Sequence, residues 1–392
     1  MVKTGLELFL TKVPHEIKGK RVGVLCHAPS ITPDFKHITE HFYTSTEFIL
    51  TSVFGPQHGL FGQTQDNMIE WKDQIHPLYS IPVFSLYGEH RKPTPEMLSK
   101  IDVLIVDLQD VGARLYTYVW TVKLCMEACQ ESGKPVWILD RPNPIAPIRY
   151  DGPVLKEDFF TFVGGASIPL CHRMTIAEIA IWLKSKYYPE CRLNIIKMEN
   201  WRRTLMYDQT GLPWVLPSPN MPTLQTAVVY PGMVLFEALN ISEGRGTTIP
   251  FELFGAPFID PWNLLKNLEG RRITGCKFRI HNFIPTFNKY SEKNCNGIQI
   301  HVTDAKSFYP VSTALEIIDA IISTSHGGAL VFNDPPYEYE HRLMPFDILS
   351  GDDLMRKTLI SGSSLTSEKE RWKEETELFR KEFRELSLYG DC

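Results

Sequence analysis

Five short apolar runs in the first half of the chain constrain its fold more than any other feature. They are RVGVLCHA (21–28), FILTSVF (48–54), IPVFSLYG (81–88), IDVLIVDLQD (101–110) and KPVWILDRPNP (134–144). Near-continuous apolar runs of this length are typical of strands that are buried on both faces. The stretch 117–133 has apolar residues at helical spacing and ends in Gly133, which can end a helix. This strand–helix–strand order predicts an α/β fold built on a Rossmann-like, doubly wound sheet.

A chain of 392 residues exceeds the roughly 250–300 residues at which a single core stops growing, so two domains are expected. The pattern changes after the proline-rich stretch 214–232. We predict a Rossmann-like domain at 1–225, with a further helix at 174–188, and a smaller α+β domain at 226–392. The second domain has strand-like pieces at 276–287 and 297–304 and helices at 313–325 and 367–386, the last with a solvated, charged face.

Composition excludes several classes of partner. The net charge is −5, with no dense Lys/Arg stretch of the kind that nucleic-acid binding needs. No apolar run approaches the roughly 20 residues that span a bilayer, and the first residues do not read as a secretion signal, so we expect a cytoplasmic protein. Eight cysteines form no C-x-x-C pair, which favours reduced structural thiols. The oligomeric state stays open.

Polar segments follow the ends of the predicted strands: GPQHG (55–59), YGEHRKP (87–93), QDVGARLYTY (109–118) and DRPNP (140–144). Ligands of doubly wound sheets bind beyond the carboxyl ends of the strands, so one crevice could collect all four. No P-loop, nucleophile elbow or G-x-G-x-x-G is present, and we expect no cofactor. Carboxylates, amides and aromatic rings suit a polyhydroxylated ligand, with ring faces stacking on Trp71, Tyr87, Tyr116 or Tyr118.

The charged candidates each have a structural alternative. Asp140 could cap a turn and pair with Arg141, because Asp before a proline-containing turn is ordinary turn chemistry. Arg114 could be a structural partner of Asp110. Both alternatives stay open at this point.

The remaining polar candidates have structural alternatives too. His58 and His172 could be interior histidines, and Asn143 and Asn220, each after a proline, could make turns. A metal-dependent hydrolase that uses His58, Asp66, Asp110 or His172 is a further alternative. No pair among these has a recognisable ligand spacing, so we expect no metal site.

The motifs FGPQHGLFG, PVFSLYG, DVLIVDLQDVGARLYTY, WILDRPNP, PLCHRMTIAEIA, WVLPSPNMP, YPGMVLFEALNISEGRGT, PFELFGAP and MPFDILSG occur in that order. Together they resemble the NamZ-type peptidoglycan exo-β-N-acetylmuramidases from about residue 20 to the C-terminus. The resemblance implies a catalytic Rossmann-like domain, a C-terminal domain that completes the cleft, and release of N-acetylmuramic acid from non-reducing ends of peptidoglycan-derived sugars or muropeptides. It also implies a role in cell-wall turnover or recycling.

Two residues depart from the family pattern, and the first is at position 57. Many relatives carry Pro-Glu-His-Gly where this chain has Pro56-Gln57-His58-Gly59. Glycoside cleavage needs a carboxylic acid at the leaving oxygen, and an amide has no such proton. Either another acid substitutes or the protein binds sugar without cleaving it.

Glu243, where relatives commonly have Val, is the first candidate for a substituting acid, reaching the glycosidic oxygen from the opposite wall. Asp110 is the second, and Asp66, Glu70 and Glu89 are further carboxylates. Gln57 and His58 would then orient the ligand. The structural alternative for Glu243 is an ion pair with Arg245.

The same resemblance suggests substrate contacts. Arg114 and Arg245 are candidates for the lactyl carboxylate of muramic acid, because a planar guanidinium binds a carboxylate through two hydrogen bonds. His172 is a candidate for a hydroxyl or acetamido contact. The other expected substrate-binding residues are Tyr116, Asp140, Arg141, Asn143 and Asn220.

Overall fold

The computed structural model describes residues 1–62, 64–66, 68–325 and 329–390. Within them the main sheet has seven strands in the order β3-β4-β2-β1-β5-β6-β9. The strands are β1 (Arg21–Cys26), β2 (Ile49–Gly55), β3 (Gln74–Ile75), β4 (Pro82–Ser85), β5 (Val103–Asp107), β6 (Val136–Leu139) and β9 (Leu193–Ile196). The pairings are parallel except for the antiparallel β3–β4 pair.

The five strands predicted from apolar runs are present, which confirms the Rossmann-like sheet. All five residues of β5 are buried, and so is β1 after its first residue. In the register, Val24 of β1 pairs with Val53 of β2 and with Ile105 of β5. The chain therefore leaves β1 on one side toward β2 and later returns on the other side as β5. This reversal opens a crevice at the carboxyl ends of these strands.

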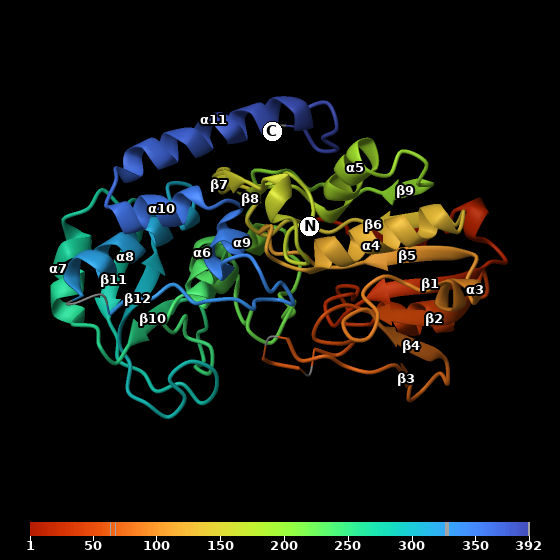
Figure 1. The fold of residues 1–392 in the computed structure, drawn as a ribbon. Coiled ribbons are helices and arrows are strands. Elements are labelled where there is room, and N and C mark those ends of the chain that lie inside the picture. The colour runs from red at the N-terminus through yellow and green to blue at the C-terminus, as the bar shows by residue number, and fades with distance from the viewer. Residues whose placement is uncertain (63, 67, 326–328, 391–392) are drawn as a thin grey trace.

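Helices cover the sheet and fill the second half of the chain (Figure 1). They are α1 (Gly5–Thr11), α2 (Ile38–Tyr43), α3 (Pro95–Ser99), α4 (Tyr118–Glu131), α5 (Ile176–Lys186), α6 (Leu224–Met233), α7 (Pro261–Glu269), α8 (Pro310–Thr324), α9 (Pro345–Ser350), α10 (Leu354–Ser361) and α11 (Leu365–Phe383). The helices predicted at 117–133, 174–188, 313–325 and 367–386 correspond to α4, α5, α8 and α11. Helix α5 begins with a capping box between Thr175 and Glu178.

The second half contains a three-stranded antiparallel sheet in the order β10-β12-β11, formed by β10 (Leu253–Ala256), β11 (Cys276–Ile280) and β12 (Asn296–Val302). Helices α7 and α8 lie beside this sheet, at the left of Figure 1. A separate hairpin, β7 (Asp151–Val154) with β8 (Pro169–Cys171), lies between the two larger sheets. The smaller α+β part that the sequence predicts is thus present.

Helix α11 runs along the top of the molecule in Figure 1 and packs on β7, α8 and α10. It buries Trp372, Phe379 and Phe383, so its solvated face is one side of a helix whose other side is core. The segment after it reaches the main sheet, where the Tyr389 hydroxyl donates a 2.7 Å hydrogen bond to Asp140 Oδ2. The charge pattern predicted the exposed face, and the buried aromatic residues join the two halves.

One hydrophobic cluster extends through both halves, from Leu104 in β5 to Ile317 in α8 and Phe379 in α11. The domain division predicted near residue 225 falls at the start of α6. It stays a prediction, because the two halves share this core.

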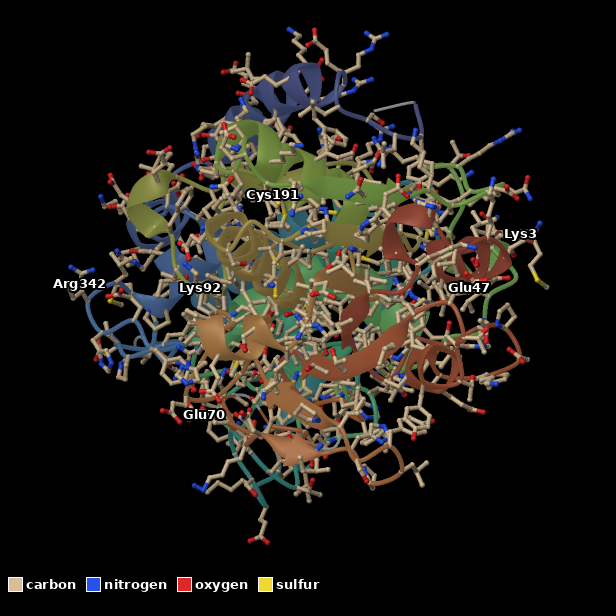
Figure 2. All side chains as sticks on the ribbon, turned by 90° about the vertical axis from the view of Figure 1, so that its right-hand side faces the viewer. Lys3, Glu47, Glu70, Lys92, Cys191 and Arg342 are labelled. Carbon is tan, nitrogen blue, oxygen red and sulfur yellow. The ribbon has the colours of Figure 1, made fainter. Side chains whose placement is uncertain are left out.

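The cysteines behave as the sequence predicts in the described part of the chain. Cys26, Cys125, Cys129, Cys171, Cys191, Cys276 and Cys295 are free thiols, and all but Cys276 are buried; Cys191 is labelled in Figure 2. Cys392 lies outside the described residues. Among the described helices, none is both long enough and apolar enough to cross a membrane.

Candidate active site

A small cavity of about 40 Å³ lies beyond the carboxyl end of β2, where the two halves meet. Four groups of residues line it: the loop after β2, the loop after β5, the 218–221 turn, and segments of the second half. The lining residues include Gln57, His58, Leu115, Tyr116, Thr117, Tyr118, Ser218, Asn220, Met221, Tyr230, Glu237, Arg245, Phe251, Tyr337 and Glu338. Of the four polar segments expected at the crevice, those after β2 and β5 therefore line the cavity.

Gln57 and His58 follow the point where Gly55 and Pro56 end β2. The Thr117 hydroxyl donates a 2.6 Å hydrogen bond to Gln57 Oε1, which fixes the orientation of the amide. His58 Nδ1 lies 2.6 Å from the Thr64 carbonyl oxygen, so Nδ1 carries the proton and Nε2 keeps its lone pair. Burial lowers the pKa of His58 to about 4 and the Arg245 charge acts in the same direction, so this ring is neutral at pH 7.

Glu237 is a buried carboxylate on the opposite wall, in the 3₁₀ helix η4 (Val234–Ala238). Its Oε1 accepts a 2.6 Å hydrogen bond from Arg245 Nη2, and its Oε2 accepts one of 2.6 Å from the Tyr337 hydroxyl. Burial alone would raise the pKa of Glu237, but Arg245 and Tyr337 outweigh burial and hold this pKa below its usual range. Glu237 is thus an ionised group at neutral pH.

Glu338 is the second carboxyl group of the cavity. It belongs to residues 334–343, which we call the pocket arm, and this arm crosses from the second half of the chain onto the main sheet. The Tyr87 hydroxyl, just after β4, donates a 3.2 Å hydrogen bond to Glu338 Oε2. Burial and the nearby Glu237 charge raise the pKa of Glu338 to about 7. The two carboxyl groups therefore differ in protonation, as in sites that pair an acid with a carboxylate.

Contacts at both of its sides hold the pocket arm in place. Just before it, Asn333 N donates a 2.8 Å hydrogen bond to the Ala238 carbonyl, next to Glu237. Within it, the Tyr339 hydroxyl donates a 3.1 Å bond to Glu70, and the Arg91 guanidinium lies 3.8 Å from the Tyr339 ring centroid. The arm therefore sets the position of Glu338 relative to both the first half and Glu237.

Aromatic rings form another wall. Tyr116 and Tyr230 have ring centroids 5.9 Å apart, and Tyr230 and Phe251 are 4.9 Å apart, both in edge-to-face geometry. Asn220 lies near this wall, where its Nδ2 donates a 2.7 Å hydrogen bond to the Gln65 carbonyl. Its Oδ1 is buried and has no hydrogen-bond donor among the described residues. An amide or hydroxyl of a bound sugar could supply that donor.

The predicted site residues divide into two groups. The structure brings Gln57, His58, Tyr116, Tyr118, Asn220 and Arg245 to the cavity, and places the others elsewhere. Glu243 does not line the cavity: its Oε2 accepts a 3.0 Å bond from Lys289 Nζ, and its Oε1 lies 3.4 Å from Arg245 Nε. The structural alternative for Glu243, an ion pair with Arg245, agrees with this geometry, since two cations already hold the carboxylate.

Asp110 and His172 lie together behind the cavity wall. Asp110 Oδ2 accepts a 2.7 Å hydrogen bond from Gly112 N and lies 3.4 Å from His172 Nε2. His172 is completely buried, and its Nδ1 accepts a 3.1 Å bond from Met174 N. The structure thus places this pair in the interior, where His172 supports the backbone.

Arg114 also lies outside the cavity. Its guanidinium is buried and donates hydrogen bonds to the carbonyl oxygens of Pro153, Ile168, Leu349 and Ser350. Gly351, at the end of α9, has a φ of 104°, and a Cβ there would lie 2.8 Å from Arg114 Nη2. Arg114 therefore joins the two halves through backbone carbonyls, which occupy both of its terminal nitrogens, and its buried Nε alone cannot bind a lactyl carboxylate through two hydrogen bonds.

The DRPNP segment after β6 faces the interior. Asp140 accepts hydrogen bonds from Ala177 N and Tyr389, and burial raises its pKa to about 7. Arg141 Nη2 donates a 2.8 Å bond to Asp107 Oδ2, and Asn143 bonds its own turn and the Met174 carbonyl. All three residues therefore have structural roles, but the expected ion pair of Asp140 with Arg141 does not form, because Arg141 pairs with Asp107.

Glu237, Tyr337 and Glu338 are cavity residues that sequence reasoning missed. Glu237 lies in the motif YPGMVLFEALNISEGRGT, where an apolar run masks it. Glu338 lies in PPYEYE, between two tyrosines and after two prolines. For Glu338 the sequence did contain a signal for a site residue, namely a carboxylate between aromatic residues in a proline-containing loop.

Across residues 1–62, 64–66, 68–325 and 329–390 no group of three or more His, Cys, Asp or Glu side chains is placed to hold a metal ion.

A larger groove of about 410 Å³ lies between α8 and α11, but its carboxylates already have hydrogen-bond or ion-pair partners. Asp151 accepts bonds from Val311 N and Ser312 N, and Glu316 pairs with Arg271 and Lys369.

Fold and site together define a two-part α/β protein with a closed, carboxylate-bearing pocket of the kind used by enzymes that cleave glycosides. The chain belongs to the NamZ exo-β-N-acetylmuramidase family: residues 22–225 match the N-terminal family model and residues 228–389 match the C-terminal one. It is 38% identical, over 99% of its length and 91% of the relative's, to the peptidoglycan beta-N-acetylmuramidase NamZ of Bacillus subtilis (strain 168).

Two crystal structures of DUF1343 family proteins from Bacteroides fragilis NCTC 9343 have the same fold. One superimposes with a TM-score of 0.86 at 29% identity, covering 99% of both chains. The other has a TM-score of 0.77 at 29% identity and covers 100% of both chains. The two-part architecture is thus shared with solved structures over the whole chain.

Proposed function

We propose that this protein is an exo-β-N-acetylmuramidase that releases N-acetylmuramic acid from the non-reducing ends of peptidoglycan-derived sugars. The observation that carries the proposal is the cavity in which Glu237 and Glu338 face aromatic rings and a free amide oxygen. The family to which the chain belongs and the name of the Bacillus subtilis relative support the same activity.

The shape of the cavity supports action at a chain end. At about 40 Å³ it is closed on several sides and much smaller than the roughly 300 Å³ of a typical ligand pocket. A terminal sugar could enter if the pocket arm shifts, whereas an uninterrupted polysaccharide would need a groove open at both ends.

Arg245 is the candidate for the lactyl carboxylate of muramic acid, because it lines the cavity and Arg114 does not. Its Nη2 and Nε lie 2.6 and 3.3 Å from Glu237 Oε1, so a substrate carboxylate would share this guanidinium with Glu237. Asn220 Oδ1 is the candidate acceptor for the acetamido N–H.

The test uses MurNAc-GlcNAc and GlcNAc-GlcNAc, together with chromogenic β-N-acetylmuramide and β-N-acetylglucosaminide. We expect release of N-acetylmuramic acid from the muramic substrates, identified by mass spectrometry, and little cleavage of the glucosamine substrates. No release by folded protein between about pH 5 and 8 would contradict the proposal. Calorimetric binding without turnover would then favour the non-catalytic sugar-binding alternative.

A further inference from the structure

Residue 57 cannot supply the proton that glycoside cleavage requires. The leaving oxygen must be protonated as its bond to the anomeric carbon breaks, and an amide does not titrate in this range. Gln57 is also fixed by Thr117, whose hydroxyl donates to Oε1 at 2.6 Å. The proton must therefore come from another group at the cavity, and the described carboxyl groups that line it are Glu237 and Glu338.

Glu237 is unsuited to this role. Arg245 donates to its Oε1 and Tyr337 to its Oε2, so both oxygens are occupied as acceptors. These bonds stabilise the carboxylate form, which has no proton to give. Glu237 is instead suited to stabilising positive charge on the sugar ring.

Glu338 has the opposite surroundings. Its Oε2 accepts a bond from Tyr87 at 3.2 Å, and within the described part of the chain no donor is placed on its Oε1. The residue is 5% exposed, and no cation is paired with it within salt-bridge distance in the described chain. A protonated Oε1 could thus donate into the cavity.

The backbone of the pocket arm holds this carboxyl group in an unusual position. Glu338 and Tyr339 have φ values of 44° and 69°, in the left-handed region that residues with a side chain rarely adopt. Reciprocal hydrogen bonds between Tyr337 and Glu340 close the turn, each 2.9 Å long. Strain of this kind persists where surrounding contacts enforce it, and it is concentrated at functional sites.

We propose that Glu338 is the general acid of this enzyme and supplies the proton that the Gln57 amide cannot. The inference rests on the proposed function. In the step, the Glu338 proton moves to the glycosidic oxygen, the bond from that oxygen to the anomeric carbon breaks, and its electron pair leaves with the sugar alcohol. Water adds to the anomeric carbon, and the proton that it loses restores Glu338.

The surroundings bring the pKa of Glu338 into the neutral range, so that about half of the molecules carry the proton at pH 7. Burial and the Glu237 charge raise its pKa to about 7, while the Tyr87 hydrogen bond and the Arg91 and Arg245 charges act in the other direction. Activity that needs the protonated form should fall as the pH rises above about 7.

The experiment compares wild type with Glu338→Gln on two substrates, MurNAc-GlcNAc and 4-nitrophenyl β-N-acetylmuramide. General acid assistance is worth about 10²–10⁴-fold, so kcat on the disaccharide should fall by that factor. The aryl glycoside has a good leaving group and should lose much less. In wild type, activity should fall as the pH rises above about 7, which we call the alkaline limb of the pH profile. This limb should disappear in Glu338→Gln.

Glu340→Gln is the matched control, because it makes the same change on the same arm outside the cavity. Glu340 pairs with Arg342, which points outward in Figure 2, and activity should stay within about twofold of wild type. If Glu338→Gln fails to fold, Glu338→Asp keeps an acid at a shorter reach. It should retain the alkaline limb at a reduced kcat.

The outcomes separate the two proposals. Wild-type hydrolysis together with an unchanged Glu338→Gln rate, or with equal losses on both substrates, would overturn the role of Glu338 and leave the proposed function standing. Absence of hydrolysis by folded wild type on both substrates would overturn the proposed function itself.

Discussion

The Tyr87 hydroxyl donates a hydrogen bond to Glu338 across 251 positions of sequence, at 3.2 Å. It connects the end of β4 in the main sheet to the pocket arm of the second half. This bond fixes one oxygen of Glu338, a residue that lines the cavity, against the first half. Several expectations depend on it and on the charges around it.

Tyr87→Phe should shift the alkaline limb of activity to higher pH. The Tyr87 hydrogen bond lowers the pKa of Glu338, so its removal raises this pKa. Hydrogen bonds to charged groups contribute about 1.5–3 kcal/mol, and one pKa unit is about 1.4 kcal/mol, so we expect a shift of about one to two pH units. The measurement is kcat/KM from pH 5 to 9, with the exposed Tyr43→Phe as control. An unchanged limb would show that Glu338 does not set it.

Arg245→Met should destabilise the protein strongly. Glu237 would stay buried without its cation, and loss of one partner of a buried ion pair costs about 3–5 kcal/mol. Denaturant unfolding measures this, with Arg342→Met as the exposed control, for which we expect a change within about 0.5 kcal/mol. A loss for Arg245→Met as small as that of the control would mean that Glu237 is not charged in the folded state.

The combination of Gln57→Glu with Glu243→Val separates the sequence-based hypothesis from the structural one. If Glu243 compensated for Gln57, restoring the family pattern at both positions should recover activity. The structure predicts instead that Glu243→Val removes the carboxylate partner of Lys289, while Arg245 keeps its ion pair with Glu237. The double variant should then unfold more easily than Gln57→Glu alone, by about 1.5–3 kcal/mol, the contribution of a hydrogen bond to a charged group. Equal stability with higher activity in the double variant would favour compensation.

His58 should make stability fall on the acid side. Its folded pKa is about 4 and its ordinary value is 6.5, so the unfolded chain binds the proton more readily in between. Stability is then full above about pH 6.5 and decreases as the pH falls toward 4, by about 3 kcal/mol at most. His58→Asn keeps a residue that tolerates the φ of 69° and should flatten this slope relative to wild type. The exposed His15→Gln should not, and an identical slope in both variants would contradict the assignment.

Short stretches of sequence predicted those parts of the fold that depend on neighbouring residues alone, such as the strands of the main sheet. The five apolar runs became strands because each buries at least one face in the core, and β5 and β6 bury both. Gln57 reached the cavity because it follows one of these strands. Arg114 could not be placed in this way, since its four carbonyl partners come from remote segments that sequence alone does not bring together. Glu338 was missed for the same reason: its position depends on Tyr87 and Glu237, from two other segments of the chain.

Helix α11 has a consequence for how the protein is made. It follows in sequence every element on which it packs, and residues after it complete a buried charge cluster in the first half. There Glu178 accepts hydrogen bonds from Arg203, Ser387 and Leu388. During synthesis the Rossmann-like sheet therefore emerges before the groups that cover β7 and satisfy Glu178 are available. The nascent first half therefore keeps an uncovered apolar face until the α11 segment has been synthesised.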